Sequence, residues 1–314
     1  MGSIAGVSDL QIVAPREVPP GHPSGVAASR TLPSRHRRHV GAWCLLDHYG
    51  PHEVPAGGLE VPVHPHTSLA TVSWLFSGEL EHGDSTGSRA LVRPGELGLT
   101  TSGRGVSQFE RSAPGAETLH GVRLWFVLPE HLSDTEPGFV HHVPEPMYVP
   151  GGIAYVFLGR LLDIESPVLT PTPLLGAELL LDADAEIVLD VPTGHEHAVL
   201  LDAGDVTLAG DPVGPGEVGY LPPGREQLRL TSAGGCRVLV LGGEPLAEPI
   251  VMWWGFVGRS HEEIVLAREA WLAETGPEPP AERRFGPVPA GAPGPMPAPS
   301  LPGGRLRPRR PACR

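Results

Sequence analysis

The chain has 314 residues and a formal charge of −13 at pH 7, and this charge is spread unevenly. Residues 276–314 hold seven Arg and two Glu, a net +5, which leaves −18 on the rest of the chain and argues against a broad nucleic-acid-binding surface. The three cysteines form no CxxC pair, the N-terminus lacks the apolar core of a signal peptide, and no run of about 18 apolar residues predicts a membrane span. A cytoplasmic protein with reduced thiols is therefore predicted.

Short strands are the elements that the sequence predicts most clearly. The first forty residues are dotted with Pro and Arg, and from residue 41 on short apolar runs are separated by Gly and Pro, of which the chain holds 41 and 38. Runs at residues 71–76, 91–93 and 122–127 are rich in β-branched, aromatic or other apolar side chains, a pattern typical of strands. An all-β fold is predicted.

Two turn motifs occur twice in the chain. Residues 77–80, Ser-Gly-Glu-Leu, and 94–98, Pro-Gly-Glu-Leu-Gly, recur as 203–206, Ala-Gly-Asp-Val, and 215–219, Pro-Gly-Glu-Val-Gly. The offset is 126 residues for the first motif and 121 for the second, so only the segment between the motifs changes length. Two tandem copies of one β-domain are predicted, and many short antiparallel strands in each copy favour a jelly-roll barrel.

These patterns divide the chain into five parts. Residues 1–40 form an N-terminal extension with the first strands, residues 41–135 a first barrel and residues 136–250 a second. Residues 251–275 are expected to form a C-terminal strand and helix. The last part, residues 276–314, contains twelve Pro and is predicted to be a disordered tail.

The C-terminal helix has a clear predicted start. Ser260 and Glu263 have the spacing of a capping box, which is typical of the first turn of a helix. The residues that follow approximate a helical apolar stripe expected to pack on a barrel, namely Ile264, Leu266, Ala267, Ala270 and Trp271.

Two short motifs place polar side chains on one face of a strand. His64 and His66 stand two residues apart, as do Gln108 and Glu110, and side chains at i and i+2 of a strand project from the same face. Imidazole nitrogen and carboxylate oxygen together suit Zn, Fe, Mn, Cu or Ni. These four residues are therefore the candidate ligands of a mononuclear metal site.

The series of motifs around these residues resembles the pirin family over roughly residues 25–275. The matching residues are His64-Pro-His66, Gly78-Glu-Leu-Glu-His82-Gly-Asp84-Ser85, Arg93-Pro-Gly95-Glu96, Gly103-Arg-Gly105, Glu110, His120-Gly121, Leu124-Trp125, Leu241-Gly-Gly-Glu-Pro-Leu246 and Glu248-Pro-Ile-Val251. The resemblance implies a bicupin fold whose N-terminal barrel binds one metal, usually iron, through three His and one Glu. It matches His64, His66 and Glu110 to ligand positions. It implies either quercetin 2,3-dioxygenase activity or metal-dependent transcriptional co-regulation.

The sequence departs from the family pattern near these ligands. The third His of the family falls at Gln108, and four further differences are Thr67, Ala70, Arg123 and Val127. An amide oxygen is a poorer ligand for Fe(II) than an imidazole. A remodelled site is therefore predicted, with metal bound weakly or not at all.

Several of these residues also have structural interpretations. Glu110 is as able to form a structural ion pair, with Arg104 or Arg123, as to bind a metal. Gln108 is favoured as a hydrogen-bonding pocket residue over a ligand. His82 and His120 match the family pattern outside the ligand set, so structural roles are expected for both. The pair His195 and His197 lies too late in the second repeat to match His64 and His66, so we expect no second metal site there.

Two functions remain open from the sequence. In the first, a divalent transition metal, with Fe²⁺ the expected ion, binds the deprotonated oxygen of a small aromatic molecule and activates it toward dioxygen. Glu110 would then act in turn as ligand and proton acceptor. In the second, the chain is a non-catalytic, metal-responsive or metal-free module that acts through a protein partner. Neither involves direct nucleic-acid binding or a membrane.

Overall fold

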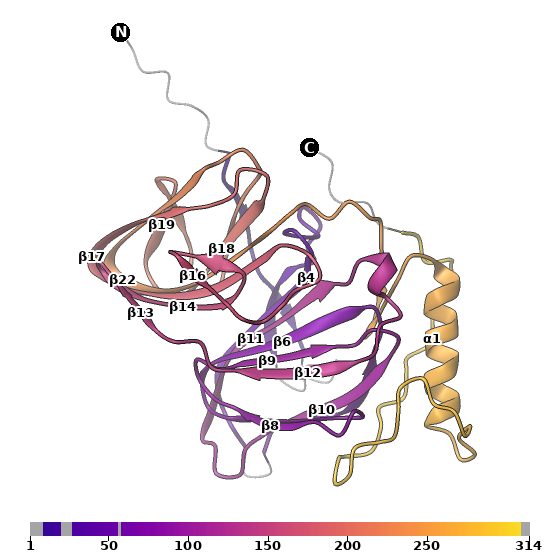
Figure 1. Ribbon diagram of the computed structural model, residues 1–314. Helices are drawn as coiled ribbons and strands as arrows, with labels where there is room; N and C mark the ends of the chain where they lie inside the picture. Colours follow the sequence, from indigo (N-terminus) through magenta and orange to yellow (C-terminus); the bar gives the residue numbers. More distant parts are fainter. Residues whose placement is uncertain (1–8, 20–26, 56–57, 309–314) are drawn as a thin grey trace. The chain divides into compact units, whose positions relative to one another are not determined.

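The computed structural model describes residues 9–19, 27–55 and 58–308, and they form an all-β fold with one α-helix (Figure 1). The chain divides into two compact units. The unit that we call the N-terminal barrel comprises Arg16–Pro33, Trp43–Val143 and Leu246–Arg314. The unit that we call the C-terminal barrel comprises Met1–Pro15, Ser34–Ala42 and Pro144–Pro245. The predicted fold class, two antiparallel cupin barrels followed by a helix, is confirmed.

Two antiparallel sheets build the N-terminal barrel. Their strands are β2 (Arg16–Val18), β3 (Ala28–Leu32), β4 (Trp43–Glu53), β5 (Glu60–His66), β6 (Leu69–Ser77), β7 (Leu80–Asp84), β8 (Arg89–Val92), β9 (Leu97–Thr101), β10 (Val106–Ser112), β11 (Thr118–Val127) and β12 (Gly138–His142). One sheet has the order β5-β10-β7-β8, and the other has the order β12-β9-β6-β11-β4-β3-β2. The 3-10 turn η1 (Glu130–Leu132) connects β11 to β12. The hairpin of β23 (Val251–Trp253) and β24 (Phe256–Gly258) also belongs to this unit.

One large sheet forms most of the C-terminal barrel. Its strands are β1 (Gln11–Val13), β13 (Met147–Val149), β14 (Gly152–Leu158), β17 (Leu174–Asp190), β18 (Glu196–Gly204), β19 (Val206–Leu208), β20 (Asp211–Val213), β21 (Val218–Leu221) and β22 (Gln227–Gly243). The main path is β1-β21-β18-β22-β17-β14-β13, and β15 (Arg160–Leu161) pairs separately with β16 (Ile164–Glu165). Its core is almost entirely Leu, Val, Ile and Ala from alternating positions of these strands.

The turn motifs that predicted the duplication have the same backbone geometry in both barrels. Gly78 and Gly204 have φ values of +84° and +87°, and Gly95 and Gly216 both have φ of +75°. At Gly78 and Gly204 a Cβ atom would lie 2.2 and 2.0 Å from a carbonyl oxygen of a neighbouring strand, so only glycine fits. The predicted internal repeat is therefore a structural repeat.

The helix α1 (His261–Glu274) begins where the capping pattern predicted. The Ser260 hydroxyl accepts a hydrogen bond from the backbone N–H of Glu263 at 3.2 Å. Ile264, Ala267 and Trp271 are buried as expected, but Leu266 is 61% exposed, so its assignment to the apolar stripe was wrong. At 100° per residue, position 266 points away from the face that 264, 267 and 271 share.

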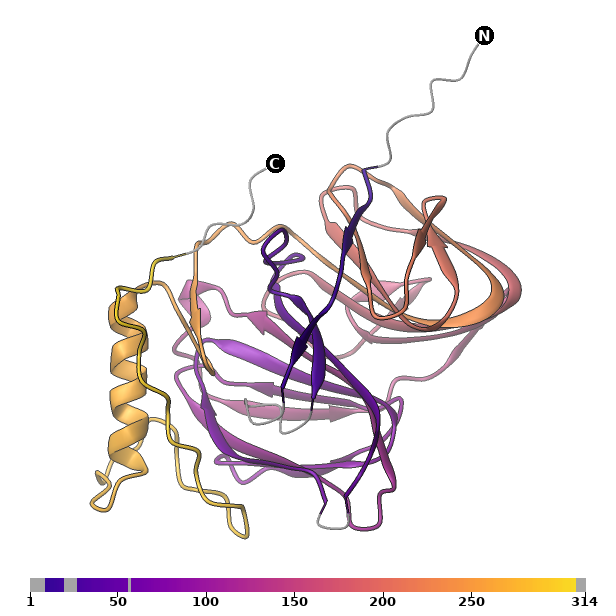
Figure 2. The same ribbon diagram turned by 180° about the vertical axis from the view of Figure 1, so that it is seen from behind.

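The proline-rich segment after the helix differs from its prediction. Residues 276–308 contain no helix or strand, yet they run along α1 in both views (Figure 1 and Figure 2) and pack on the N-terminal barrel. Phe285 is fully buried against Phe109, Phe256 and Trp271. Backbone hydrogen bonds join Met296 N–H to Val63 O at 2.8 Å and Ser107 N–H to Phe285 O at 3.2 Å. The expectation of disorder is therefore wrong for residues 276–308, which are held by Phe285, by these backbone bonds and by side-chain bonds such as that from Trp271 Nε1 to Met296 O at 2.8 Å. Residues 309–314 lie outside the described residues.

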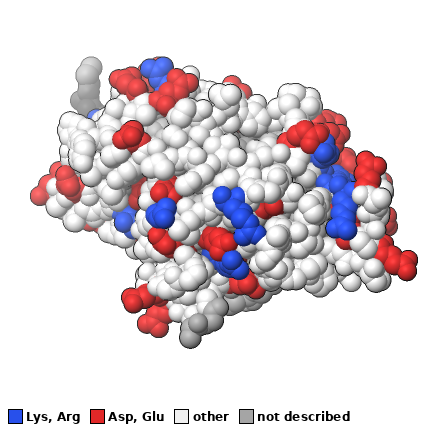
Figure 3. Space-filling view, turned by 60° about the horizontal axis from the view of Figure 1, so that its bottom comes forward, with Lys and Arg blue, Asp and Glu red and all other residues white. Residues whose placement is uncertain are grey.

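Charges on the surface are mixed rather than segregated. On the face drawn in Figure 3, basic and acidic side chains lie in small neighbouring groups, with no broad basic field on that face. Within the described part of the chain, no helix is long and apolar enough to cross a membrane. Cys44 and Cys236 are buried free thiols, and Cys313 lies outside the described residues.

Candidate functional site in the N-terminal barrel

Strands β5 and β10 bring the four predicted site residues together. Gln108 pairs directly with His64 and Val106 with His66 in the antiparallel ladder, so the two motifs lie side by side. His64, His66, Gln108 and Glu110 are all at most 3% exposed. A register shift interrupts the β5–β10 ladder between Gln108 and Glu110, and as a result Glu110 pairs with Val61.

Backbone carbonyl groups fix the tautomer of both histidines. Nδ1 of His64 lies 2.9 Å from Pro62 O, and Nδ1 of His66 lies 3.1 Å from Gly255 O. A carbonyl can only accept, so each Nδ1 carries the proton and each Nε2 keeps a lone pair. Burial lowers the pKa of His64 to about 4 and that of His66 well below its usual value, so both rings are neutral at pH 7. This is the state in which imidazole binds a metal.

Two buried lone-pair donors in this cluster have no hydrogen-bond partner among the described residues. They are Nε2 of His66 and Oε1 of Gln108. Leaving such atoms buried and unpaired costs about 1–3 kcal/mol each. The His64 and His66 rings meet edge to face with centroids 4.8 Å apart, and Trp125 packs against His66 at 5.0 Å, so the His66 ring is held in place. Each atom is a donor of the kind that can bind a cation.

Glu110 is engaged by side chains of the opposite sheet. Its Oε1 accepts a hydrogen bond from the Ser73 hydroxyl at 2.6 Å, and its Oε2 accepts one from Arg123 Nη2 at 2.7 Å. Burial alone would raise the pKa of Glu110, but the Arg123 charge and the Ser73 hydrogen bond outweigh burial and lower it to about 2. Of the two ion pairs that the sequence left open, the structure contains the one with Arg123.

The ion pair continues into a row of alternating charges across the second sheet. Arg123 is paired in register with Ser73 on β6 and with Asp47 on β4. Asp47 in turn accepts two hydrogen bonds from Arg30, at 2.5 and 2.6 Å. Burial would lower the pKa of Arg123, but Glu110, Tyr49 and Asp47 raise it. The guanidinium therefore stays charged in the barrel interior.

A second polar pair lies on β7, which is the neighbour of β10. His82 pairs in register with Glu110, and Asp84 with Gln108. His82 Nε2 lies 3.1 Å from Asp84 Oδ2, and the His82 ring stacks on Phe139 with centroids 4.2 Å apart. Burial opposes the ionisation of Asp84, but bonds from His82 and Thr86 outweigh burial and lower its pKa. These contacts fit the structural role expected of His82.

The predicted ligands lie on neighbouring strands, but their ligand atoms do not converge on one point as a bound metal would require. Among the residues that the structure describes, no three His, Cys, Asp or Glu side chains of a single barrel bring their ligand atoms within 4.8 Å of one another. For Glu110 the cause is visible, because both of its oxygens are bound to Ser73 and Arg123. The two imidazoles and the Gln108 amide are the neutral polar groups of this cluster.

The remaining departures from the family pattern do not all face this cluster. Thr67 donates a hydrogen bond to Val257 O, and Val127 packs in an apolar cluster with Val257 and Trp125. Ala70 alternates with Ser73 to the other face of β6. Only Gln108 and Arg123 change the contacts of the predicted ligands directly. The sequence reasoning missed Ser73 and Gly255, and nothing in their spacing marks them.

Comparison with known proteins identifies the family. The family model named Pirin matches residues 25–126, and the model of the Pirin C-terminal cupin domain matches residues 176–275. The chain is 32% identical over 256 residues to a pirin-like protein of Caulobacter vibrioides, covering 78% of this chain and 87% of that one. The chain belongs to the pirin family.

Other pirin relatives carry names that refer to an activity. A Pseudomonas aeruginosa protein with a provisional quercetin 2,3-dioxygenase name is 40% identical over 249 residues, 79% of each chain. A crystal structure described as quercetin 2,3-dioxygenase from Acinetobacter baumannii is 34% identical, with a TM-score of 0.87 over 94% of this chain and 96% of that one. The resemblance predicted from the motifs is confirmed.

Proposed function

We propose that this pirin is a weak, metal-dependent oxidoreductase of the quercetin 2,3-dioxygenase type. The observation that carries the proposal is the pair of buried, unpartnered donors His66 Nε2 and Gln108 Oε1. His64, His66 and Gln108 would hold a divalent transition metal, with Fe²⁺ the expected ion. The activity names of the Pseudomonas and Acinetobacter relatives support a flavonol, a small aromatic molecule, as substrate.

The bound metal would supply Lewis acidity and a route for dioxygen chemistry. The protein's own residues set the conditions for that chemistry. Pro62 and Gly255 hold the two imidazoles in the tautomer that presents Nε2. Glu110 is the proposed acceptor of the substrate's phenolic proton, at the oxygen that Ser73 now binds. A carboxylate with a pKa of about 2 is a weak base, so proton removal, and with it turnover, should be slow.

One observation favours a second function. Both oxygens of Glu110 are already occupied by Ser73 and Arg123, which leaves no charged ligand for the cation. A metal-free or metal-responsive binding module that acts through a protein partner is the alternative that this arrangement supports. Metal content and turnover together separate the two functions.

The test is quercetin consumption and oxygen uptake after reconstitution with Fe²⁺, Mn²⁺, Co²⁺, Ni²⁺ or Cu²⁺. Slow turnover that needs an added metal and is lost in His66→Gln is the expected result. His141→Gln is the matched control, because His141 is an exposed histidine of the same barrel. Turnover that survives His66→Gln would overturn the proposed site. Absence of both metal and turnover would favour the binding module.

A further inference from the structure

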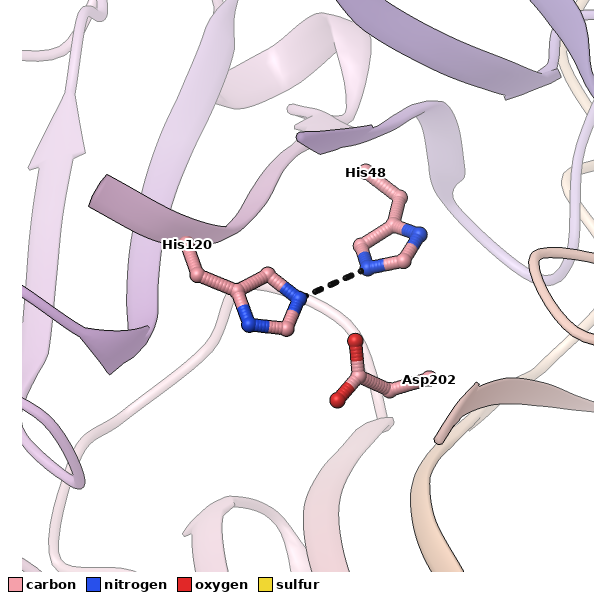
Figure 4. Close-up of side chains that lie close together, drawn as sticks. All are labelled: His48, His120 and Asp202. Atoms are coloured by element: carbon pink, nitrogen blue, oxygen red, sulfur yellow. Dashed lines mark hydrogen bonds between the residues drawn. The ribbon is translucent and has the colours of Figure 1, made fainter. Parts of the chain in front are cut away.

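Two histidines outside the barrel site face one another across neighbouring strands. His48 lies on β4 and His120 on β11, and their Nε2 atoms are 3.3 Å apart (Figure 4). Both side chains are half-buried. Both histidines belong to the N-terminal barrel, whereas Asp202, which the view also labels, belongs to the other compact unit.

The strand register explains why these two rings meet. His48 pairs with Val122 on β11, and His120 precedes Val122 by two residues, so the two histidines are diagonal neighbours on one face of the sheet. Register shifts lie next to His120 on both sides of β11: the ladder with β4 shifts between Leu119 and Gly121, and the ladder with β6 shifts just after the pair His120–Ser77. Such irregularities re-aim side chains. Phe76 packs edge-on against both rings, with centroids 5.0 Å from His120 and 6.2 Å from His48.

This histidine pair is separate from the barrel site. Along β4 and β11, His48 and Val122 alternate with Asp47 and Arg123, which belong to the charge row next to Glu110. Side chains of adjacent strand positions point to opposite faces. The pair therefore lies on the face of the sheet that is turned away from the Glu110 cluster.

The spacing of the two nitrogens matches that of two ligands on one metal ion. For Zn–N bonds of about 2.0–2.1 Å at a tetrahedral angle, the two nitrogens lie about 3.3 Å apart. Two Nε2 atoms that face each other share one proton, which one ring donates and the other accepts. A metal ion can replace this proton when the donor ring passes it to its own Nδ1 or to water, and both Nε2 lone pairs then face the ion. Imidazole nitrogen suits Zn²⁺, Ni²⁺ and Cu²⁺.

We propose that His48 and His120 form a second metal-binding site, for a Zn²⁺-, Ni²⁺- or Cu²⁺-class ion, on the sheet face opposite the barrel interior. The two imidazoles supply two positions, and water completes the coordination. The proposal stands independently of the proposed dioxygenase function, because the two sites share no residue.

The test is metal binding by the full chain, titrated with Ni²⁺ or Zn²⁺ in the presence of a competing chelator. In the His64→Gln/His66→Gln background, which removes the barrel ligands, one ion should still bind. Adding His48→Gln or His120→Gln should weaken that binding at least tenfold. His52→Gln is the matched control, because His52 lies on the same strand and its Nε2 contacts Ala27 O instead. Unchanged binding in both pair variants would overturn the proposal.

A substituted ligand gives a readout that a structural role would not produce. In His120→Cys, bound Co²⁺ should show a thiolate-to-cobalt charge-transfer band, and adding His48→Gln should weaken it. Absence of this band in a folded variant contradicts direct ligation. If the barrel binds no metal at all, wild type should bind one ion and the His64→Gln/His66→Gln protein should keep it. Failure of the dioxygenase proposal and failure of this one are therefore distinguishable.

Discussion

Replacing Arg123 by Gln tests how strongly the buried ion pair shapes the N-terminal barrel. The pKa of Glu110 lies at about 2 instead of 4.5, a difference that corresponds to about 3 kcal/mol in favour of the ionised carboxylate. Removing one partner of a buried pair leaves the other charge uncompensated, which costs about 3–5 kcal/mol in other proteins. We expect Arg123→Gln to lower the free energy of unfolding by about 3 kcal/mol at pH 7.

The measurement is thermal or urea unfolding followed by tryptophan fluorescence. A loss of this size corresponds to a fall of roughly 6–12 °C in Tm for a unit of 150–250 residues. The matched control is Arg111→Gln, because Arg111 makes the same kind of fork to Glu81, at 2.8 and 3.0 Å, but with its side chain 36% exposed. An exposed pair is worth at most about 1 kcal/mol. A loss in Arg123→Gln no larger than in Arg111→Gln would refute the reasoning.

The same variant should also reverse the pH dependence of the contribution that Glu110 makes to the free energy of unfolding. In the wild type the folded pKa of Glu110 is depressed, so its contribution is present above about pH 4.5 and is lost as the pH falls toward about 2. Without Arg123, burial raises the folded pKa above the unfolded value. The contribution is then present at low pH and lost as the pH rises. The stability gap between wild type and variant should therefore narrow from pH 7 to pH 4, and a constant gap contradicts this assignment.

Three further predictions address the ligand set, the tail and the charge network. Gln108→His should bind Fe²⁺ more tightly than wild type in anaerobic titration, and equal affinity would mean that Gln108 does not occupy the missing ligand position. Phe285→Ala should destabilise the protein by about 3–5 kcal/mol, as expected for a buried aromatic, whereas Val288→Ala at a 40% exposed tail position should change stability little. Ser73→Ala should raise the pKa of Glu110, seen as a shift of acid unfolding to higher pH, and an unchanged acid transition would argue against the hydrogen bond.

The repeated turns and the paired motifs made much of the fold predictable. Gly78 and Gly204 mark equivalent positive-φ turns, so the duplication could be inferred from the residue type alone. His64 and Gln108 were expected to belong to one site, and the register pairs them directly. Periodicity of two fixes the face of a strand, and this is why the gathering of the motifs could be anticipated.

The chemistry inside the barrel was less accessible from the sequence. Whether Glu110 pairs with Arg104 or Arg123 depends on the packing of two sheets, which no local pattern encodes. The register shift between Gln108 and Glu110 is likewise a tertiary feature. The prediction of a disordered tail failed for residues 276–308 for a different reason. Their composition predicts disorder, but Phe285 is buried and hydrogen bonds to the barrel and to α1 hold the segment.

The carbonyl of Gly255 that orients His66 has a consequence for the order of events during synthesis. These two residues are 189 positions apart in the chain. At 5–20 residues per second, roughly 10–40 s separate their appearance from the ribosome. The Met296 N–H that bonds to Val63, directly before His64, emerges later still. His66 therefore lacks the carbonyl that sets its tautomer until residue 255 has been made, and a product truncated before that residue would contain His66 without this contact.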